Sequence, residues 1–380
     1  MEVKQVATIL NKVYSEVTGK STVINEDLSN VVDVGKEILG ATDVDNYVKS
    51  LINHIGKVIF VDRTYSKNVP QIMTDSWTFG SALEKVRVEV DDFVENDSWK
   101  LTKGTSVDPF KFNPPSATAK FYNKMTTFEL DISFTELQVR ESFSNVSQLN
   151  SFFSTIENRI RMKIELANES LIMRTIDFLM AQKIHSKNNV VNLLTMYNAK
   201  FGTTLTATKA LTDKDFLRYS AQQIKLYESY LSRASMLYND GGYVTFTPPE
   251  MLRKVLLTEF ASGMEVYLQS DTFHNDLVKL GNYTDVPYWQ GTGTKSELSF
   301  DEISKIDIKI DDTNTVTQKG IVGVMFDVNA CMVCNENQRV TSIYQPKQEF
   351  YNYFYKFDAR YLVDTMENCV VFVVADSASK

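Results

Sequence analysis

The chain has 380 residues, of which 43% are hydrophobic and 23% are charged, which is ordinary for a protein of two or three domains. Its formal net charge of −8 and isoelectric point near 5.2 argue against a dedicated nucleic-acid binder, which usually carries a basic stripe. The first residues lack the apolar core of a signal peptide, and the longest apolar run, Val370 to Ala375, is far too short to cross a bilayer.

Three short amphipathic helices are predicted within residues 1–60. In each, apolar residues recur three and four positions apart, and a glycine follows the last of them: Gly19, Gly40 and Gly56. Their apolar stripes are narrow. These helices could form a small bundle, or an arm that is buried against another subunit.

Two segments of alternating apolar and polar residues predict β-strands that return on each other. Valines alternate with charged residues over 85–90, and a second alternation over 119–137 places four residues on one face: Phe128, Leu130, Ile132 and Phe134. Aromatic residues lie among polar neighbours in and around the connection: Trp99, Phe110, Phe112 and Phe121. An isolated hairpin cannot bury them. We therefore predict inter-subunit contacts for these four residues, the alternative being a surface loop with adventitious aromatics.

Residues 148–184 contain no Gly and no Pro and predict one long α-helix of roughly 50–55 Å, with Ser147 as its N-cap. One face is marked at steps of three and four: Leu149, Phe153, Ile156, Ile160, Ile164, Ala167, Leu171, Thr175 and Phe178. Beyond Leu166 the segment is apolar almost all round, so other elements should cover this half on several sides. The simplest alternative is a long core helix without a special role.

The remainder of the chain predicts a mixed lobe followed by a strand-rich end. Helices are expected over 213–238 and from Pro248-Pro249 through Phe260. Strands are expected over these ranges: 243–246, 307–310, 321–328, 339–344, 350–363 and 369–374.

The sequence offers no convincing catalytic, cofactor or metal site. Cys331 and Cys334 have the spacing of a zinc or redox pair, but only Cys369 and three scattered histidines remain as further ligands, so we interpret the cysteines as structural. The carboxylates at 91, 92, 95 and 97 lack the glycine turn of a calcium-binding loop, and the Gly291-Thr-Gly293 segment matches no phosphate loop. We therefore predict a protein that is not an enzyme.

The order of these elements resembles the major capsid proteins of tailed bacteriophages, which share the Hong Kong ninety-seven-like coat fold. Three segments carry the resemblance. Residues 77–101 with the returning strand resemble the extended loop of that family, and residues 152–183 resemble its spine helix. The segment from Tyr344-Gln-Pro-Lys through Tyr351-Asn-Tyr-Phe to Asn368-Cys-Val-Val-Phe-Val is similar to the end of coats from phages of Gram-positive hosts.

This resemblance implies an α+β fold with five parts. They are a helical N-terminal arm (1–60), a peripheral domain (61–90 and 126–187) with its spine helix (148–184), an extended β-hairpin loop (91–125), an axial domain (188–335), and a closing β-rich segment shared between the two domains (336–380).

The function implied is the head protein of a tailed double-stranded DNA phage, assembled in the host cytoplasm into hexamers and pentamers of an icosahedral virion shell. Its implied partners are further copies of itself, a scaffolding protein, a portal, and packaged DNA touched weakly and nonspecifically, with decoration proteins left open and no membrane. An acidic inner wall would keep packed DNA from adhering. The alternatives are an encapsulin-like nanocompartment shell and a phage tail-tube or baseplate subunit.

Overall fold

The computed structural model describes residues 11, 72–73, 83–89, 99, 103, 110, 112, 114–135, 146–269, 281–290 and 299–376. The three helices predicted in residues 1–60 lie outside these residues except at Asn11, which is helical. The carboxylates at 91–97 and the Gly291–Gly293 segment also lie outside them.

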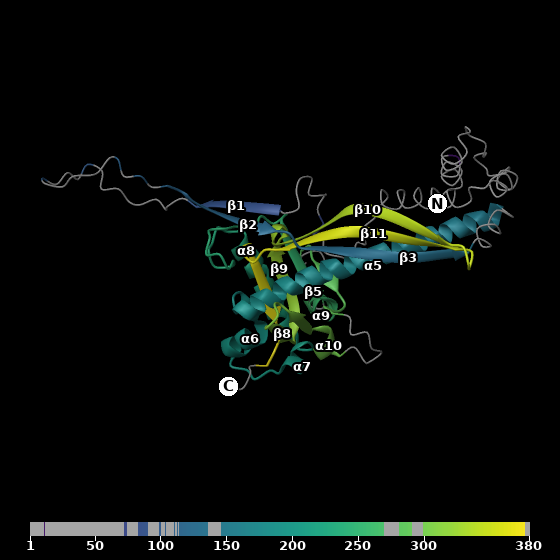
Figure 1. Cartoon of the computed structure of the whole chain (residues 1–380). Coiled ribbons are helices and arrows are strands. Elements are labelled where there is room, and N and C mark those ends of the chain that lie inside the picture. The colour runs from purple at the N-terminus through teal and green to yellow at the C-terminus, as the bar shows by residue number, and fades with distance from the viewer. Residues whose placement is uncertain are drawn as a thin grey trace.

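A single helix, α5 (Val146–Ser186), runs through the molecule for 41 residues (Figure 1). The predicted long helix is confirmed, but Ser147 lies inside its first turn and is not its N-cap. The second half is covered as expected, and its buried residues include Leu171, Ile172, Ile176, Leu179 and Met180. Because an α-helix rises ~1.5 Å per residue, 41 residues give a rod of roughly 60 Å.

A three-stranded antiparallel sheet lies along the N-terminal part of α5 (Figure 1). Its order is β10 (Cys331–Gln345), β11 (Phe350–Val363), β3 (Met125–Thr135). The alternation predicted for the last of these is confirmed, because Phe134 is buried and the three apolar residues before it on that face are partly buried in the core. Tyr353, at the centre of β11, is fully buried.

A five-stranded mixed sheet forms the second centre of the fold. Its order is β4 (Val190–Asn192), β12 (Cys369–Val373), β9 (Ile321–Asp327), β5 (Leu252–Leu257) and β6 (Thr284–Val286). The β4–β12 and β5–β6 pairs are parallel, and the two pairs made by β9 are antiparallel. Every residue of β9 is buried, as expected for a central strand covered on both faces.

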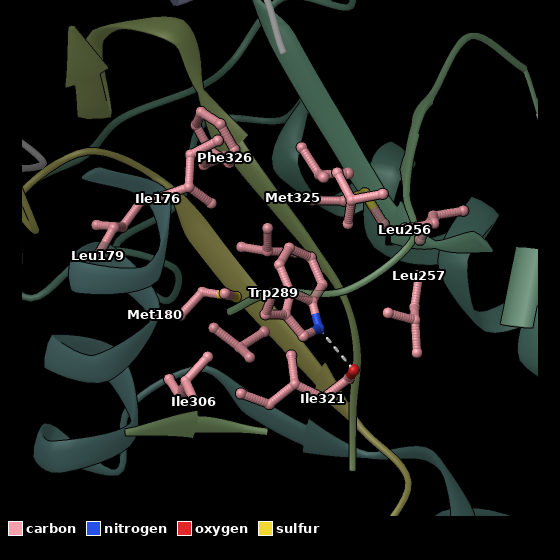
Figure 2. Packing of buried hydrophobic residues seen from close by; sticks show 14 of the residues in the cluster. Ile176, Leu179, Met180, Leu256, Leu257, Trp289, Ile306, Ile321, Met325 and Phe326 are labelled. Carbon is pink, nitrogen blue, oxygen red and sulfur yellow. Dashed lines mark hydrogen bonds between the residues drawn. The ribbon is translucent and has the colours of Figure 1, made fainter. Parts of the chain in front are cut away.

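Helices and short strands surround this sheet. They are α6 (Leu193–Phe201), α7 (Ala207–Ala210), α8 (Lys214–Leu231), α9 (Thr258–Gln269), α10 (Phe300–Ile303), the β7–β8 pair (Ile306–Lys309 and Thr315–Gln318) and a 3₁₀ turn (Val328–Ala330). Figure 2 shows how the layers join: Trp289, from the segment after β6, packs among residues of α5 and β9, and its indole N–H donates to the Ile321 carbonyl at 2.8 Å. Within the described residues, no helix has the length and apolar character needed to span a membrane.

Three predictions in the mixed lobe are wrong. The helix expected over 213–238 ends at Leu231, and the chain then forms a narrow ribbon whose two arms meet at the Ser235–Thr245 bridge, so the strand expected over 243–246 is reduced to this bridge. The helix expected from Pro248 is instead strand β5, and the following helix begins at Thr258. The run Leu-Arg-Lys-Val-Leu-Leu is held extended because β9 and β6 pair with it on both sides and bury most of its side chains.

Candidate assembly surface

A two-stranded hairpin, β1 (Leu83–Glu89) and β2 (Ser116–Tyr122), lies at one edge of the molecule (Figure 1). The strands are antiparallel, with Val86 opposite Ala119 and Lys85 opposite Lys120. Side chains of directly opposite residues share a face, and successive residues alternate between faces. The hairpin therefore has one face that carries lysine and arginine and a second face that is mostly apolar.

The charged face is fixed to the turn between β11 and β12, residues 364–368, which we call the junction turn. Lys85 Nζ lies 3.1 Å from Asp364 Oδ2 and donates to the Asn329 carbonyl at 2.7 Å. Arg87 Nη2 lies 2.6 Å from Glu367 Oε1. Lys120 Nζ, from the second strand, reaches Asp364 Oδ1 at 3.4 Å. Three cations of the hairpin thus surround two carboxylates of the turn.

These ion pairs are largely buried, so solvent screens their electrostatic attraction less than it screens exposed pairs. The side chain of Asp364 is 1% exposed, while those of Lys85 and Arg87 are below one fifth exposed. Burial alone would raise the pKa of Asp364, but the charge of Lys85 and the hydrogen bonds to the carboxylate hold it below its ordinary value. Burial and the nearby Asp364 raise the pKa of Tyr122, so its phenol stays neutral. Asp364 is therefore an ionised anchor for the base of the hairpin.

The same junction turn holds two other parts of the fold. Lys183 of α5 is fully buried, and its ammonium donates to Asp240 Oδ1 and to the Thr365 carbonyl, both at 2.9 Å. Thr245, in the ribbon that follows α8, donates through its hydroxyl to Asn368 Oδ1 at 2.8 Å. The hairpin, the end of the long helix and the ribbon therefore share one anchoring segment, which fixes the direction in which the hairpin leaves the molecule.

The other face of the hairpin is exposed and mainly apolar. It comprises Glu84, Val86, Val88, Ala117, Ala119 and Phe121, and we call it the outer hairpin face. Val86, Val88 and Phe121 are 58%, 61% and 64% exposed. A contiguous apolar face on a two-stranded sheet is unfavourable in water and usually marks a contact with another molecule.

All four aromatic residues predicted to make inter-subunit contacts have exposed side chains. The exposed fractions of Trp99, Phe110, Phe112 and Phe121 are 98%, 89%, 84% and 64%. Only Phe121 lies on a described strand, where it joins the outer hairpin face; the other three lie in the connection between β1 and β2. Their contact with another subunit stays a prediction.

The sequence reasoning missed the anchoring charges and the role of the valines. The alternation of valine with Lys85 and Arg87 predicted the strand but not that the charged face would point toward the molecule. A usable signal was the pair of carboxylates, Asp364 and Glu367, in a short turn between two strands. The positive charges of β1 and the negative charges of the junction turn would have suggested that these two segments lie together.

The cysteines are buried in the core and form no disulfide. Burial raises the pKa of the Cys369 thiol to about 12 and that of Cys331 well above its ordinary value. Across the part of the chain that the structure describes, no group of three or more His, Cys, Asp or Glu side chains is placed to hold a metal ion.

Comparison with known proteins places this geometry in context. Residues 6–373 match the model of a family described as Phi29-like phage major capsid protein. Among solved structures, the chain is similar to one from the capsid structure of Staphylococcus phage Andhra, with a TM-score of 0.52, 10% identity, and coverage of 83% of this chain and 86% of that one. It is also similar to one from the structure of the head fibre and inner core protein of native bacteriophage P68, with a TM-score of 0.53, 12% identity, and coverage of 82% and 87%. A search of curated proteins found no match. At these identities the solved structures bear on the fold alone.

Proposed function

The chain belongs to the Phi29-like phage major capsid proteins, and from this premise we propose that its copies form the hexamers and pentamers of an icosahedral shell around a double-stranded DNA genome. It is a tailed-phage major capsid protein with a phage capsid fold, and hence a component of the virion. The family match favours this role over a nanocompartment shell or a tail subunit.

The observation that carries the proposal is the outer hairpin face. Val86, Val88 and Phe121 are more than half exposed although the opposite face of the same hairpin is bound to the junction turn by ion pairs. The chain thus holds an apolar surface in a fixed direction without covering it. In a closed shell every subunit offers the same surfaces to its neighbours, so a surface left bare in one copy is covered by the next.

We propose that the hairpin lies over the adjacent subunit of the same capsomer. Trp99, Phe110 and Phe112, which lie between its two strands, would then contact that neighbour together with Phe121. In this arrangement residues 188–335 are the part of the subunit nearest the capsomer axis, and α5 belongs to the peripheral part that meets other subunits. The extended loop, 91–125, contains the β2 arm of the hairpin.

The remaining partners follow from the same proposal. Assembly takes place in the host cytoplasm with a scaffolding protein and a portal, and the finished shell holds DNA through weak nonspecific contacts. A net charge of −8 supports the last point, because an acidic wall repels the phosphate backbone. The proposed role is structural and involves no catalysis. Whether decoration proteins also bind the shell is left open.

Electron microscopy of the expressed full chain tests the proposal. Closed polyhedral particles that sediment as large assemblies are the expected result. Tubes would favour a tail subunit, and lasting monomers with catalytic turnover would refute both structural roles. Closed particles that carry a cellular cargo protein in place of DNA would favour a nanocompartment.

A further inference from the structure

A cavity of about 860 Å³ lies between α5 and the segment 285–290. Leu166 and Tyr288, which line it, are 56% and 43% exposed, whereas Trp289 and Asp177 are each 2% exposed. Met173 lies between these extremes, being partly buried. The cavity is therefore lined by half-exposed apolar side chains and by one buried carboxyl group, that of Asp177. Its volume is in the range of clefts that bind small ligands, so it has ample room for an inserted side chain.

Asp177 is the unusual member of this lining. Its Oδ1 atom is buried and has no hydrogen-bond partner within the described residues. A buried polar atom without a partner costs about 1–3 kcal/mol, so a group that enters the cavity and donates a hydrogen bond to Asp177 would recover this energy. Burial also raises the pKa of Asp177 well above its ordinary value, because desolvation disfavours the ionised carboxylate.

The other ionisable groups that line the cavity are two carboxylates and one guanidinium. Glu169 and Asp285 are carboxylates at its exposed side, and Asp285 accepts a hydrogen bond from the Thr258 hydroxyl at 3.0 Å. Arg174 is the cation that lines the cavity, and its side chain is exposed. Three carboxyl groups thus face one guanidinium. The described residues form no cluster suited to a metal ion, so a metal is not the natural complement.

We propose that this cavity receives a lysine or arginine side chain from an adjacent copy of the chain, with its cationic end hydrogen-bonded to Asp177. The aliphatic stem of such a side chain can pack on Leu166, Met173 and Tyr288, and its cationic end can donate hydrogen bonds to the buried Asp177 carboxyl group. The inference rests on the proposed function, because a shell subunit is surrounded by copies of itself. Its 40 Lys and Arg residues make the donor available in every neighbour.

Asp177→Asn tests the proposal, with Glu165→Gln as the matched control. Glu165 is an exposed carboxylate on the same helix that does not line the cavity, so the control makes the same carboxyl-to-amide change nearby. For Asp177→Asn we expect the subunit to unfold at the same or a higher denaturant concentration than the wild type. We expect the free subunit concentration in equilibrium with shells to rise about tenfold or more, because a cation is left without its buried partner. Asp177→Leu provides a second variant should the asparagine form fail to fold.

An electron cryomicroscopy map of the wild-type shell supplies the second readout. Density for a basic side chain of a neighbouring copy beside Asp177 supports the proposal. An empty cavity, or one filled by the same chain or by a different protein, overturns it, as does Asp177→Asn assembling like Glu165→Gln. A wild-type chain that forms no closed shells would instead refute the proposed function, and this inference with it.

Discussion

Replacing the three large apolar residues of the outer hairpin face should separate assembly from folding. The triple variant Val86→Thr, Val88→Thr and Phe121→Thr makes the face polar with threonine, a β-branched residue that favours strands. The opposite face, with its ion pairs to the junction turn, is untouched. The variant subunit should therefore fold with nearly the stability of the wild type.

The size of the assembly defect follows from exposure. Fully burying a valine or phenylalanine side chain contributes roughly 1.5–3 kcal/mol. These three residues are 58%, 61% and 64% exposed in one copy, so covering each on a neighbour should contribute about 1–2 kcal/mol. Together they give about 3–5 kcal/mol for each contact, which corresponds to a factor of roughly 10²–10⁴ in the association constant.

Sedimentation of shells against free subunits measures this effect, and denaturant unfolding of the free subunit checks that the fold is intact. Val266→Thr is the control, because Val266 is 61% exposed on α9 and lies far from β1 and β2 in the chain. If the triple variant assembled at the same concentration as the control, the outer hairpin face would not be a contact surface, and the reasoning from exposure would be wrong.

Three further predictions concern the stability and chemistry of the subunit. Asp364→Asn should lower the free energy of unfolding by about 3 kcal/mol, because three cations lose a buried partner. Since the folded pKa of Asp364 is lowered, this contribution is present above its ordinary pKa of about 4 and is lost as pH falls through the lowered value. Acid unfolding curves of the wild type should therefore converge on those of the variant, and parallel curves would contradict the assignment. Gly320→Ala should destabilise the subunit by about 2 kcal/mol or more in thermal unfolding, because Gly320 has φ +76° and an added Cβ would overlap the Val374 carbonyl; an unchanged melting temperature would show that this turn can relax. The three buried thiols should react with a disulfide reagent at pH 8 only after denaturation, and rapid reaction of any one in the native subunit would contradict its burial.

The long helix and the main strands were predictable because their signals are local. A segment of 41 residues without Gly or Pro, with apolar positions three and four apart, has few stable conformations other than a helix. The alternation in β3 and the apolar runs of β9 and β12 are equally direct. The resemblance to tailed-phage coats, drawn from the order of these elements, agrees with the family match.

Features that depend on contacts between distant segments were not predictable. Strand β5 was read as a helix because its leucines suit either structure, and only pairing with β9 and β6 decides between them. The junction turn joins residues about 280 positions apart, such as Lys85 and Asp364, and no local pattern reports that distance. The candidate contact aromatics were identified from composition alone, since apolar residues among polar neighbours need a partner that the sequence does not name.

The division of the chain into five parts remains a prediction at the level of domains. The observed elements show why boundaries are hard to place by sequence: β11 pairs with β3 in one sheet, while β12, only a short turn later, lies in the five-stranded sheet. One short segment thus contributes to two sheets, and the turn between its strands anchors the hairpin.

The most direct test of the account is an electron cryomicroscopy map of particles formed by the full chain. We expect closed shells in which a neighbouring copy covers Val86, Val88 and Phe121. Shells in which this face points into solvent or folds back onto its own subunit would contradict the account.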